Sequence, residues 1–236
     1  MRITLPQLAQ NTLDFPPLSS ALASPDGLLA FGGDLSPSRL MRAYQSGIFP
    51  WFSPGEPILW WSPSRRMILP ANDFHVSRSL RKHLRRMNWR VTLNQAFEQV
   101  IETCATINRQ DQGTWITDEM IDAYKALHQM GAAHSIEVWE QQQLIGGLYG
   151  VAPGAVFCGE SMFHYRSNAS KVAFYALTTL LQRLPDAFID CQMHTDHLAS
   201  LGAFEISRTD FAQRLHDALV VPTPDNFWHP RTLLHP

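Results

Sequence analysis

Two carboxylates interrupt apolar, strand-like stretches of this sequence. Glu160 lies within Phe157-Cys158-Gly159-Glu160-Ser161-Met162-Phe163, and Asp190 lies within Phe188-Ile189-Asp190-Cys191-Gln192. Taking an unpaired carboxylate out of water costs on the order of several kcal/mol, so each needs a partner. Each stands near a cysteine and a polar residue, which predicts a buried polar site. A purely structural pair, held by arginines or backbone amides, is the alternative that the sequence leaves open.

Other reactive residues form no strong motif. Ser161 and Cys158 are possible nucleophiles, but no Gly-x-Ser-x-Gly elbow occurs and no histidine is paired with them. Residues 191–197 hold Cys, His, Asp and His in a spacing that matches no zinc signature, so we expect no metal and a helix that begins near Asp196. The nearest Gly-rich candidate for a CoA pyrophosphate, Gly146-Gly147, lies in a strand pattern, so we expect no cofactor.

The composition is that of a folded chain with one large or two small domains. Its 236 residues are 45% hydrophobic and carry a net charge of −2, so any nucleic-acid contact must come from a local patch. The three cysteines are far apart and form no CxxC pair, which fits a reducing cytoplasm. No apolar run approaches the roughly 20 residues of a membrane span, and no signal peptide is recognisable, so we expect a cytoplasmic protein.

A basic segment provides such a patch. Residues 77–87 are predicted to form a helix with an apolar face, and five cations cover the rest of it: Arg78, Arg81, Lys82, Arg85 and Arg86. Like charges four residues apart repel each other, and bound phosphates would relieve the repulsion. This favours contact with nucleic acid, although a solvated face is the usual explanation of a charge run.

Tryptophans gather among turn residues. Trp51, Trp60 and Trp61 lie in a Gly- and Pro-rich stretch between residues 47 and 63. A hydrophobic plug between domains is the simpler interpretation; a platform that stacks a base, worth about 1–3 kcal/mol, is the alternative. Trp115 comes just before a predicted helix start, where a ligand can reach it, and this favours stacking.

The elements that must position these residues fall into two parts. Residues 1–63 are predicted to form a small, loop-rich N-terminal domain, with one helix that is capped by Ser36 and ends at Gly47. Residues 64–236 are predicted to form a second domain. After the basic helix, Asn94 is expected to cap a third helix and Thr117 a fourth one, which Gly131 closes.

The second domain has a recognisable order of elements. Strands are predicted over residues 134–140, 144–151 and 156–163, then a helix over 168–184, a strand over 188–192, and short helices and a strand at the end. Three antiparallel strands, a helix, a strand and a helix resemble the core of the GNAT acyltransferases. The predicted class is α+β, with a mixed, mostly antiparallel sheet.

Nine motifs in order carry a resemblance to a known family. They are Gly32-Gly33-Asp34-Leu35-Ser36-Pro37, Gly47-Ile48-Phe49-Pro50-Trp51-Phe52, Trp60-Trp61-Ser62-Pro63, Gly113-Thr114-Trp115-Ile116, His134-Ser135-Ile136-Glu137, Phe157-Cys158-Gly159-Glu160-Ser161-Met162-Phe163, Asn168-Ala169-Ser170-Lys171, Asp190-Cys191-Gln192 and Asn226-Phe227-Trp228. Together they resemble the leucyl/phenylalanyl-tRNA–protein transferase family, from about residue 26 to residue 231.

The resemblance implies a bacterial cytoplasmic aminoacyltransferase. Such an enzyme moves Leu or Phe, and less readily Met, from aminoacyl-tRNA to the N-terminal Arg or Lys of a protein. The acceptor is thereby marked for degradation through the N-degron pathway. The expected partners are therefore aminoacyl-tRNA and acceptor proteins, with no membrane, no metal and no CoA.

The resemblance also implies roles for individual residues. Gln192 accepts a hydrogen bond from the attacking amine, Asp190 polarises or orients Gln192, and Glu160 anchors the cationic acceptor. Trp51 and Trp115 hold the terminal adenosine by stacking, and the five cations of the basic helix bind the tRNA backbone. The pocket for the Leu or Phe side chain is expected to be lined by Leu148, Phe157, Gly159, Met162, Leu177 and Ile189.

The chain departs from the family pattern at three places. Leu177 stands where the pattern can carry an aromatic residue, His194-Thr195 replaces a more amide-like sequence, and the loop over residues 107–112 is slightly longer. None of these involves the three expected catalytic residues. The alternative functions are a noncatalytic RNA-binding module, which would use the basic helix and the tryptophans, and an acyl-CoA N-acyltransferase on the GNAT core.

Overall fold

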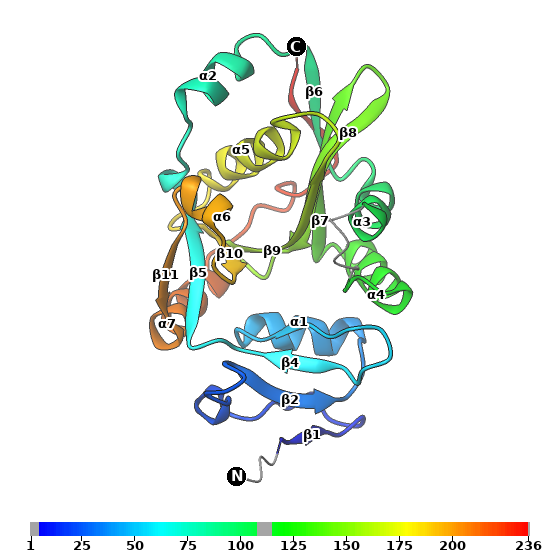
Figure 1. The fold of residues 1–236 in the computed structure, drawn as a ribbon, viewed down its shortest axis with the longest axis vertical. Helices are drawn as coiled ribbons and strands as arrows, with labels where there is room; N and C mark the ends of the chain where they lie inside the picture. The colour runs from blue at the N-terminus through cyan, green and yellow to red at the C-terminus, as the bar shows by residue number, and fades with distance from the viewer. Residues whose placement is uncertain (1–4, 108–114, 236) are drawn as a thin grey trace.

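The structure is a computed structural model that describes residues 5–107 and 115–235. It contains two sheets. The smaller one has the strand order β1-β2-β4-β3, and the larger one has the order β11-β5-β10-β9-β8-β7-β6-β12. Figure 1 shows helix α1 lying between them. The expected longer loop falls mostly on residues 108–112, and part of one family motif falls on Gly113 and Thr114; these lie outside the described residues.

The N-terminal part is more regular than the predicted loop-rich domain. Its sheet consists of β1 (Gln7–Leu8), β2 (Leu28–Gly32), β3 (Phe49–Pro50) and β4 (Leu59–Trp61), with a 3-10 turn at Leu18–Ser20. Trp60 is fully buried and its indole N–H donates to the Gly32 carbonyl at 2.9 Å, as the plug interpretation expects. The division between residues 63 and 64 remains a prediction.

Helix α1 (Pro37–Gln45) follows the predicted capping pattern. The Ser36 side chain accepts a hydrogen bond from the Arg39 backbone N–H, and Pro37 takes the first helical position. Gly47 follows the helix with φ of 76°, a conformation that glycine adopts without a steric penalty. The helix is thus placed by local sequence, and its position between the sheets follows from tertiary contacts.

The large sheet confirms the predicted class. Strands β7 (Ala133–Glu140), β8 (Gln143–Val151) and β9 (Val156–His164) are antiparallel neighbours, and β10 (Phe188–Gln192) pairs in parallel with β9. Helix α5 (Ala169–Leu181) connects β9 to β10, as the GNAT-like order predicts. Strands β5 (Arg65–Pro70) and β6 (Trp89–Leu93) were not predicted from the sequence. Only one strand was predicted near the C-terminus, where the structure has two, β11 (Phe204–Ser207) and β12 (Arg231–Leu234).

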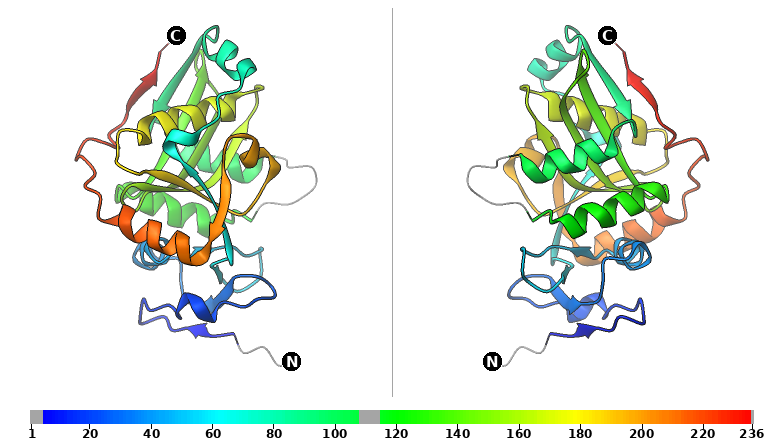
Figure 2. Two further views of the ribbon diagram at one scale, coloured as in Figure 1. Left: turned by 90° about the vertical axis from the view of Figure 1, so that its left-hand side faces the viewer. Right: turned by 90° about the vertical axis from the view of Figure 1, so that its right-hand side faces the viewer.

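Helices cover both faces of the sheet. In Figures 1 and 2, α5 lies on one face and α3 and α4 lie on the other. The remaining bounds are η2 (Ala71–Asp73), α2 (Arg78–Leu84), α3 (Phe97–Thr106), α4 (Asp118–Gln129), α6 (Asp196–Ser200) and α7 (Arg208–Leu219). Ser77 and Thr117 cap α2 and α4 as N-cap residues, while the basic helix ends three residues earlier than predicted. Among the described helices, none is long and apolar enough to cross a membrane.

The predicted cap of the third helix is wrong. Asn94 has φ of 55° and its side-chain oxygen accepts from the Ser135 backbone N–H at 2.9 Å, so it serves the neighbouring strand. The N-cap of α3 is Ala96, which has no side chain able to accept. The buried carboxylate of Glu137 on β7 accepts from the Ala96 backbone N–H instead, because a helix N-terminus leaves N–H groups free and favours negative charge.

Candidate active site

A cavity of about 400 Å³ lies alongside the middle of β9 and the end of β10. Its walls come from strands β8, β9 and β10 and from helices α5 and α6. They include all six residues predicted for the side-chain pocket: Leu148, Phe157, Gly159, Met162, Leu177 and Ile189. Glu160 and Gln192 also line it. Three strands and one helix thus bring together residues that are up to 44 positions apart in the sequence, from 148 to 192.

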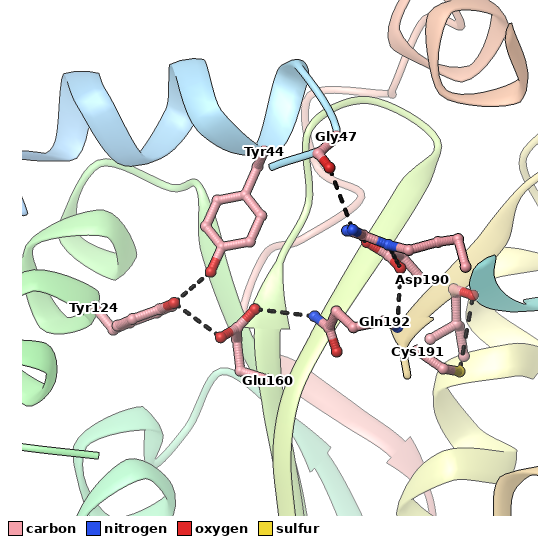
Figure 3. Close-up of polar contacts among 9 residues, drawn as sticks. Tyr44, Gly47, Tyr124, Glu160, Asp190, Cys191 and Gln192 are labelled. Carbon is pink, nitrogen blue, oxygen red and sulfur yellow. Dashed lines mark hydrogen bonds and ion pairs between the residues drawn. The ribbon is translucent and has the colours of Figure 1, made fainter. Parts of the chain in front are cut away.

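Glu160 is held by neutral donors. The Tyr124 hydroxyl donates to one carboxylate oxygen at 2.8 Å, and the Gln192 side-chain N–H donates to the other at 3.3 Å. The Tyr124 hydroxyl is in turn hydrogen-bonded to that of Tyr44 (Figure 3). Burial raises the pKa of Glu160 to about 7, and hydrogen bonds from Tyr124 and Tyr44 oppose part of this rise. Burial also raises the pKa of both tyrosines, so both remain protonated at neutral pH.

Asp190 is held by a charge. Arg66 donates to both carboxylate oxygens, from Nε at 2.8 Å and from Nη2 at 2.6 Å, and its Nη1 donates to the Gly47 carbonyl at 3.2 Å. The exposed fractions of the two side chains are 2% for Arg66 and 0% for Asp190. Burial alone would lower the pKa of Arg66, but Asp190 raises it above its usual value. The guanidinium therefore stays charged inside the protein.

Gln192 lies at an irregular end of β10. The pairing with β5 shifts register between Asp190 and Gln192, and Gln192 has φ of 57° in the left-handed region. Its backbone N–H donates to Asp190 at 3.0 Å, while its side-chain amide turns to Glu160. Asp190 thus fixes the backbone of Gln192 rather than polarising its amide, which modifies the expected relay.

The cysteines and the segment 191–197 show no sign of an activated nucleophile or a metal site in the described residues. Burial raises the pKa of the Cys158 and Cys191 thiols, so both are protonated and weakly nucleophilic at neutral pH. Helix α6 begins at Asp196 with Thr195 as its N-cap, which confirms the helix start predicted there. Within residues 5–107 and 115–235, no three His, Cys, Asp or Glu side chains form a group that could hold a metal ion.

The tryptophans and the basic helix lie outside the cavity. Trp51 is 40% exposed and contacts Trp61, with ring centroids 5.6 Å apart; Trp115 is partly buried. Neither lines the cavity. The five cations surround a surface hollow of about 390 Å³ at α2 and the two residues after it: Arg78, Arg81, Lys82, Arg85 and Arg86. In the part of the chain that the structure describes, no carboxylate pairs with these exposed cations.

Sequence reasoning missed three residues of the site. Tyr44 and Tyr124 fit the apolar faces of their helices, and nothing in the local pattern showed that their hydroxyls meet. Arg66 stands in a run, Arg65-Arg66-Met67-Ile68-Leu69, whose last three residues are fully buried. An arginine at the start of such a strand was the available signal for the partner that Asp190 requires.

Comparison with known proteins identifies the family of this chain. A family model described as leucyl/phenylalanyl-tRNA protein transferase matches residues 68–216, and one for the N-terminal domain of the same family matches residues 33–64. The chain belongs to this family. The transferase is 58% identical over 226 residues to the leucyl/phenylalanyl-tRNA–protein transferase of Pseudoalteromonas atlantica, covering 96% of this chain and 97% of the relative. It is 52% identical to that of Citrobacter koseri, covering 98% of each.

The comparisons confirm the predicted family and the predicted enzyme class, an aminoacyltransferase. They disfavour both alternatives, the noncatalytic RNA-binding module and the acyl-CoA enzyme. Solved structures are more distant: a GCN5-related N-acetyltransferase-like protein from Streptococcus suis has a TM-score of 0.32 and 11% identity, covering 70% of this chain and 61% of that one. That likeness is too low to carry an argument about function.

The buried ion pair generates a prediction about stability. Asp190→Asn removes the charge that compensates Arg66, so the free energy of unfolding should fall by about 3–5 kcal/mol in urea denaturation. Asp225→Asn, on the exposed C-terminal segment, is the matched control and should change it by less than about 0.5 kcal/mol. A loss no larger than that of the control would show that Asp190 does not compensate the guanidinium.

Proposed function

We propose that the cavity receives the aminoacyl group of an aminoacyl-tRNA. In this proposal the transferase moves Leu or Phe, and less readily Met, to the N-terminal Arg or Lys of an acceptor protein. The observation that supports it best is the convergence of all six predicted pocket residues on one cavity, next to Glu160 and Gln192. The proposal extends to action in the cytoplasm and to marking of the acceptor for degradation.

The shape and chemistry of the cavity suit a large apolar side chain. Its volume of about 400 Å³ lies in the usual range for small-ligand sites, and most of its walls are aliphatic or aromatic. Met162 on one wall is unbranched and can adjust to Leu, Phe or Met. Polar side chains would leave their polar atoms unpaired in such a pocket, which penalises them strongly.

The polar end of the cavity suits the acceptor. The ester that joins an amino acid to tRNA is an activated acyl group, so holding the amine near its carbonyl supplies much of the rate. Because the Gln192 amide N–H is engaged by Glu160, its side-chain oxygen is the acceptor for a hydrogen bond from the amine. Glu160 is the carboxylate that meets the cationic end of the acceptor.

The tRNA contacts are proposed on two surfaces outside the cavity. Trp51 and Trp115 stack the terminal adenosine, and the five cations on α2 and just after it contact phosphates of the tRNA backbone without reading its sequence. In Figure 1, α2 lies at the end of the molecule away from the small sheet.

The direct test is transfer of labelled Leu from Leu-tRNA to a peptide that begins with Arg. We expect the label to appear in the peptide with no acyl-CoA present, and a peptide beginning with Glu to remain unlabelled. Binding of tRNA without transfer would instead identify a noncatalytic RNA-binding module. A requirement for acyl-CoA would identify the other alternative.

A substitution tests the acceptor site. Glu160→Gln removes the negative charge that meets the acceptor, so it should lower kcat/KM for Arg-starting peptides at least about tenfold while changing the Kd for Leu-tRNA by less than about twofold. Glu205→Gln, on the exposed face of β11, is the control and should change neither value. Equal losses in peptide use and tRNA binding would contradict the assigned role.

The salt dependence of tRNA binding tests the basic helix. Replacing Arg81 and Arg85 by Ala should reduce the slope of log K against log salt by about 0.7–0.9 for each phosphate contact that is lost. Arg214→Ala, on the exposed face of α7, should leave the slope unchanged. An unchanged slope in the double variant would mean that this face of α2 is merely solvated.

A further inference from the structure

Two hydroxyl groups and one carboxylate form a hydrogen-bonded series that runs from the N-terminal part of the protein to the cavity. Tyr44 on α1 contacts Tyr124 on α4, and Tyr124 donates to Glu160 on β9 at 2.8 Å. The two tyrosine rings are fully buried, and the Tyr124 ring packs edge-on against that of Tyr149 at 5.6 Å. These hydrogen bonds therefore hold the Glu160 carboxylate in one orientation at the cavity wall.

Two polar groups beside Glu160, the Gln192 amide and the Asp190 carboxylate, are poorly placed to take a proton from the acceptor. The Gln192 amide is not a base at neutral pH, and its N–H already donates to Glu160. The Asp190 carboxylate is fully buried, is held at both oxygens by Arg66 and does not line the cavity. Glu160 is different because the groups that donate hydrogen bonds to its two oxygens are neutral: the Tyr124 phenol and the Gln192 amide.

Glu160 is surrounded by groups that leave it able to titrate. Those that face it are Tyr44 from α1, Arg66 from β5, Tyr124 from α4, Cys158 from β9 and Asp190 from β10. Burial raises its pKa to about 7, Asp190 adds to the rise, and Tyr124, Tyr44 and Arg66 oppose it. A carboxyl group that is about half ionised at neutral pH can accept a proton and release it again.

We propose that Glu160 takes the proton that the acceptor ammonium must lose before it attacks, and that Tyr124, held by Tyr44, is the positioning residue for this step. The inference rests on the proposed function of the cavity. It gives Glu160 a role beyond anchoring the acceptor, and it leaves Gln192 as a hydrogen-bond acceptor that orients the amine.

The step balances without a cofactor. Glu160 removes one proton from the ammonium, and the freed electron pair on nitrogen attacks the ester carbonyl carbon to form the C–N bond. The C–O bond to the terminal ribose then breaks. The leaving oxygen takes a second proton from the same nitrogen, and the amide product keeps the third. Glu160 returns its proton to solvent, so one proton is released for each transfer.

The pH profile of kcat/KM for an Arg-starting peptide, at saturating Leu-tRNA, tests the proposal. For the wild-type enzyme we expect a bell: a rising limb near pH 7 as Glu160 ionises, and a falling limb near pH 8, where an α-ammonium with a pKa of about 7.7–8.0 loses its proton in solution. Glu160→Gln should abolish the rising limb. The residual rate should then follow the free amine, rising to a plateau above about pH 8.

Tyr124→Phe gives an independent readout and keeps the ring that packs on Tyr149. It removes a hydrogen bond that holds the pKa of Glu160 down, so the rising limb should move up by about one pH unit. Tyr44→Phe should move it in the same direction by less. Tyr165→Phe, which changes an exposed tyrosine beyond the end of β9, is the control and should leave the profile in place.

The outcomes separate this proposal from the proposed function. If wild-type enzyme transfers no Leu, the function itself is wrong. If it transfers Leu but the rising limb persists in Glu160→Gln, or stays in place in Tyr124→Phe, another group takes the proton. If the Glu160→Gln variant is too slow for a pH profile to be recorded, the position of the rising limb in Tyr124→Phe decides whether Glu160 takes the proton. Thermal unfolding of each variant shows whether a change comes from loss of the fold.

Discussion

The ion pair between Arg66 and Asp190 determines how the two parts of the chain meet. A guanidinium with 2% of its side chain exposed has to be compensated within the protein, and Asp190 does so through two parallel hydrogen bonds. The same guanidinium donates to the Gly47 carbonyl and lies 4.7 Å and 4.5 Å from the rings of Phe49 and Phe211. One side chain thus joins β5, β10, α7 and the segment after α1.

The cavity wall that carries Glu160 and Gln192 depends on this pair. Because Asp190 is fixed, the backbone N–H of Gln192 finds its acceptor there, and this contact stabilises the register shift and the left-handed conformation at the end of β10. The bend turns the Gln192 side chain towards Glu160 on β9. From the other side, α1 brings Tyr44 to Tyr124. Residues 37–50 therefore complete a site whose other residues come mainly from the large sheet.

The sequence indicated the chemically important residues of the site better than the residues that hold them in position. Glu160 and Asp190 stood out because a charge in an apolar strand needs a partner, and the family motifs then indicated the lining of the cavity. The partner itself lay 124 positions away in β5, a strand that local pattern did not reveal. Asn94 shows the same limit: it has the residue type of a helix cap, but Ser135 and the buried Glu137 on β7 changed its role.

The two buried carboxylates can perform different tasks because their partners differ. Asp190 faces the Arg66 guanidinium at both oxygens, and it also accepts the backbone N–H of Gln192, so it holds Arg66 and the bend at Gln192 in place. Glu160 is held by a phenol and an amide, which stabilise the anion only partly against the loss of water, and its pKa rises to about 7. The nearest partner of Asp190 is thus a cation, whereas that of Glu160 is a neutral phenol, and this difference is the basis of the proposal that Glu160 gains and loses a proton.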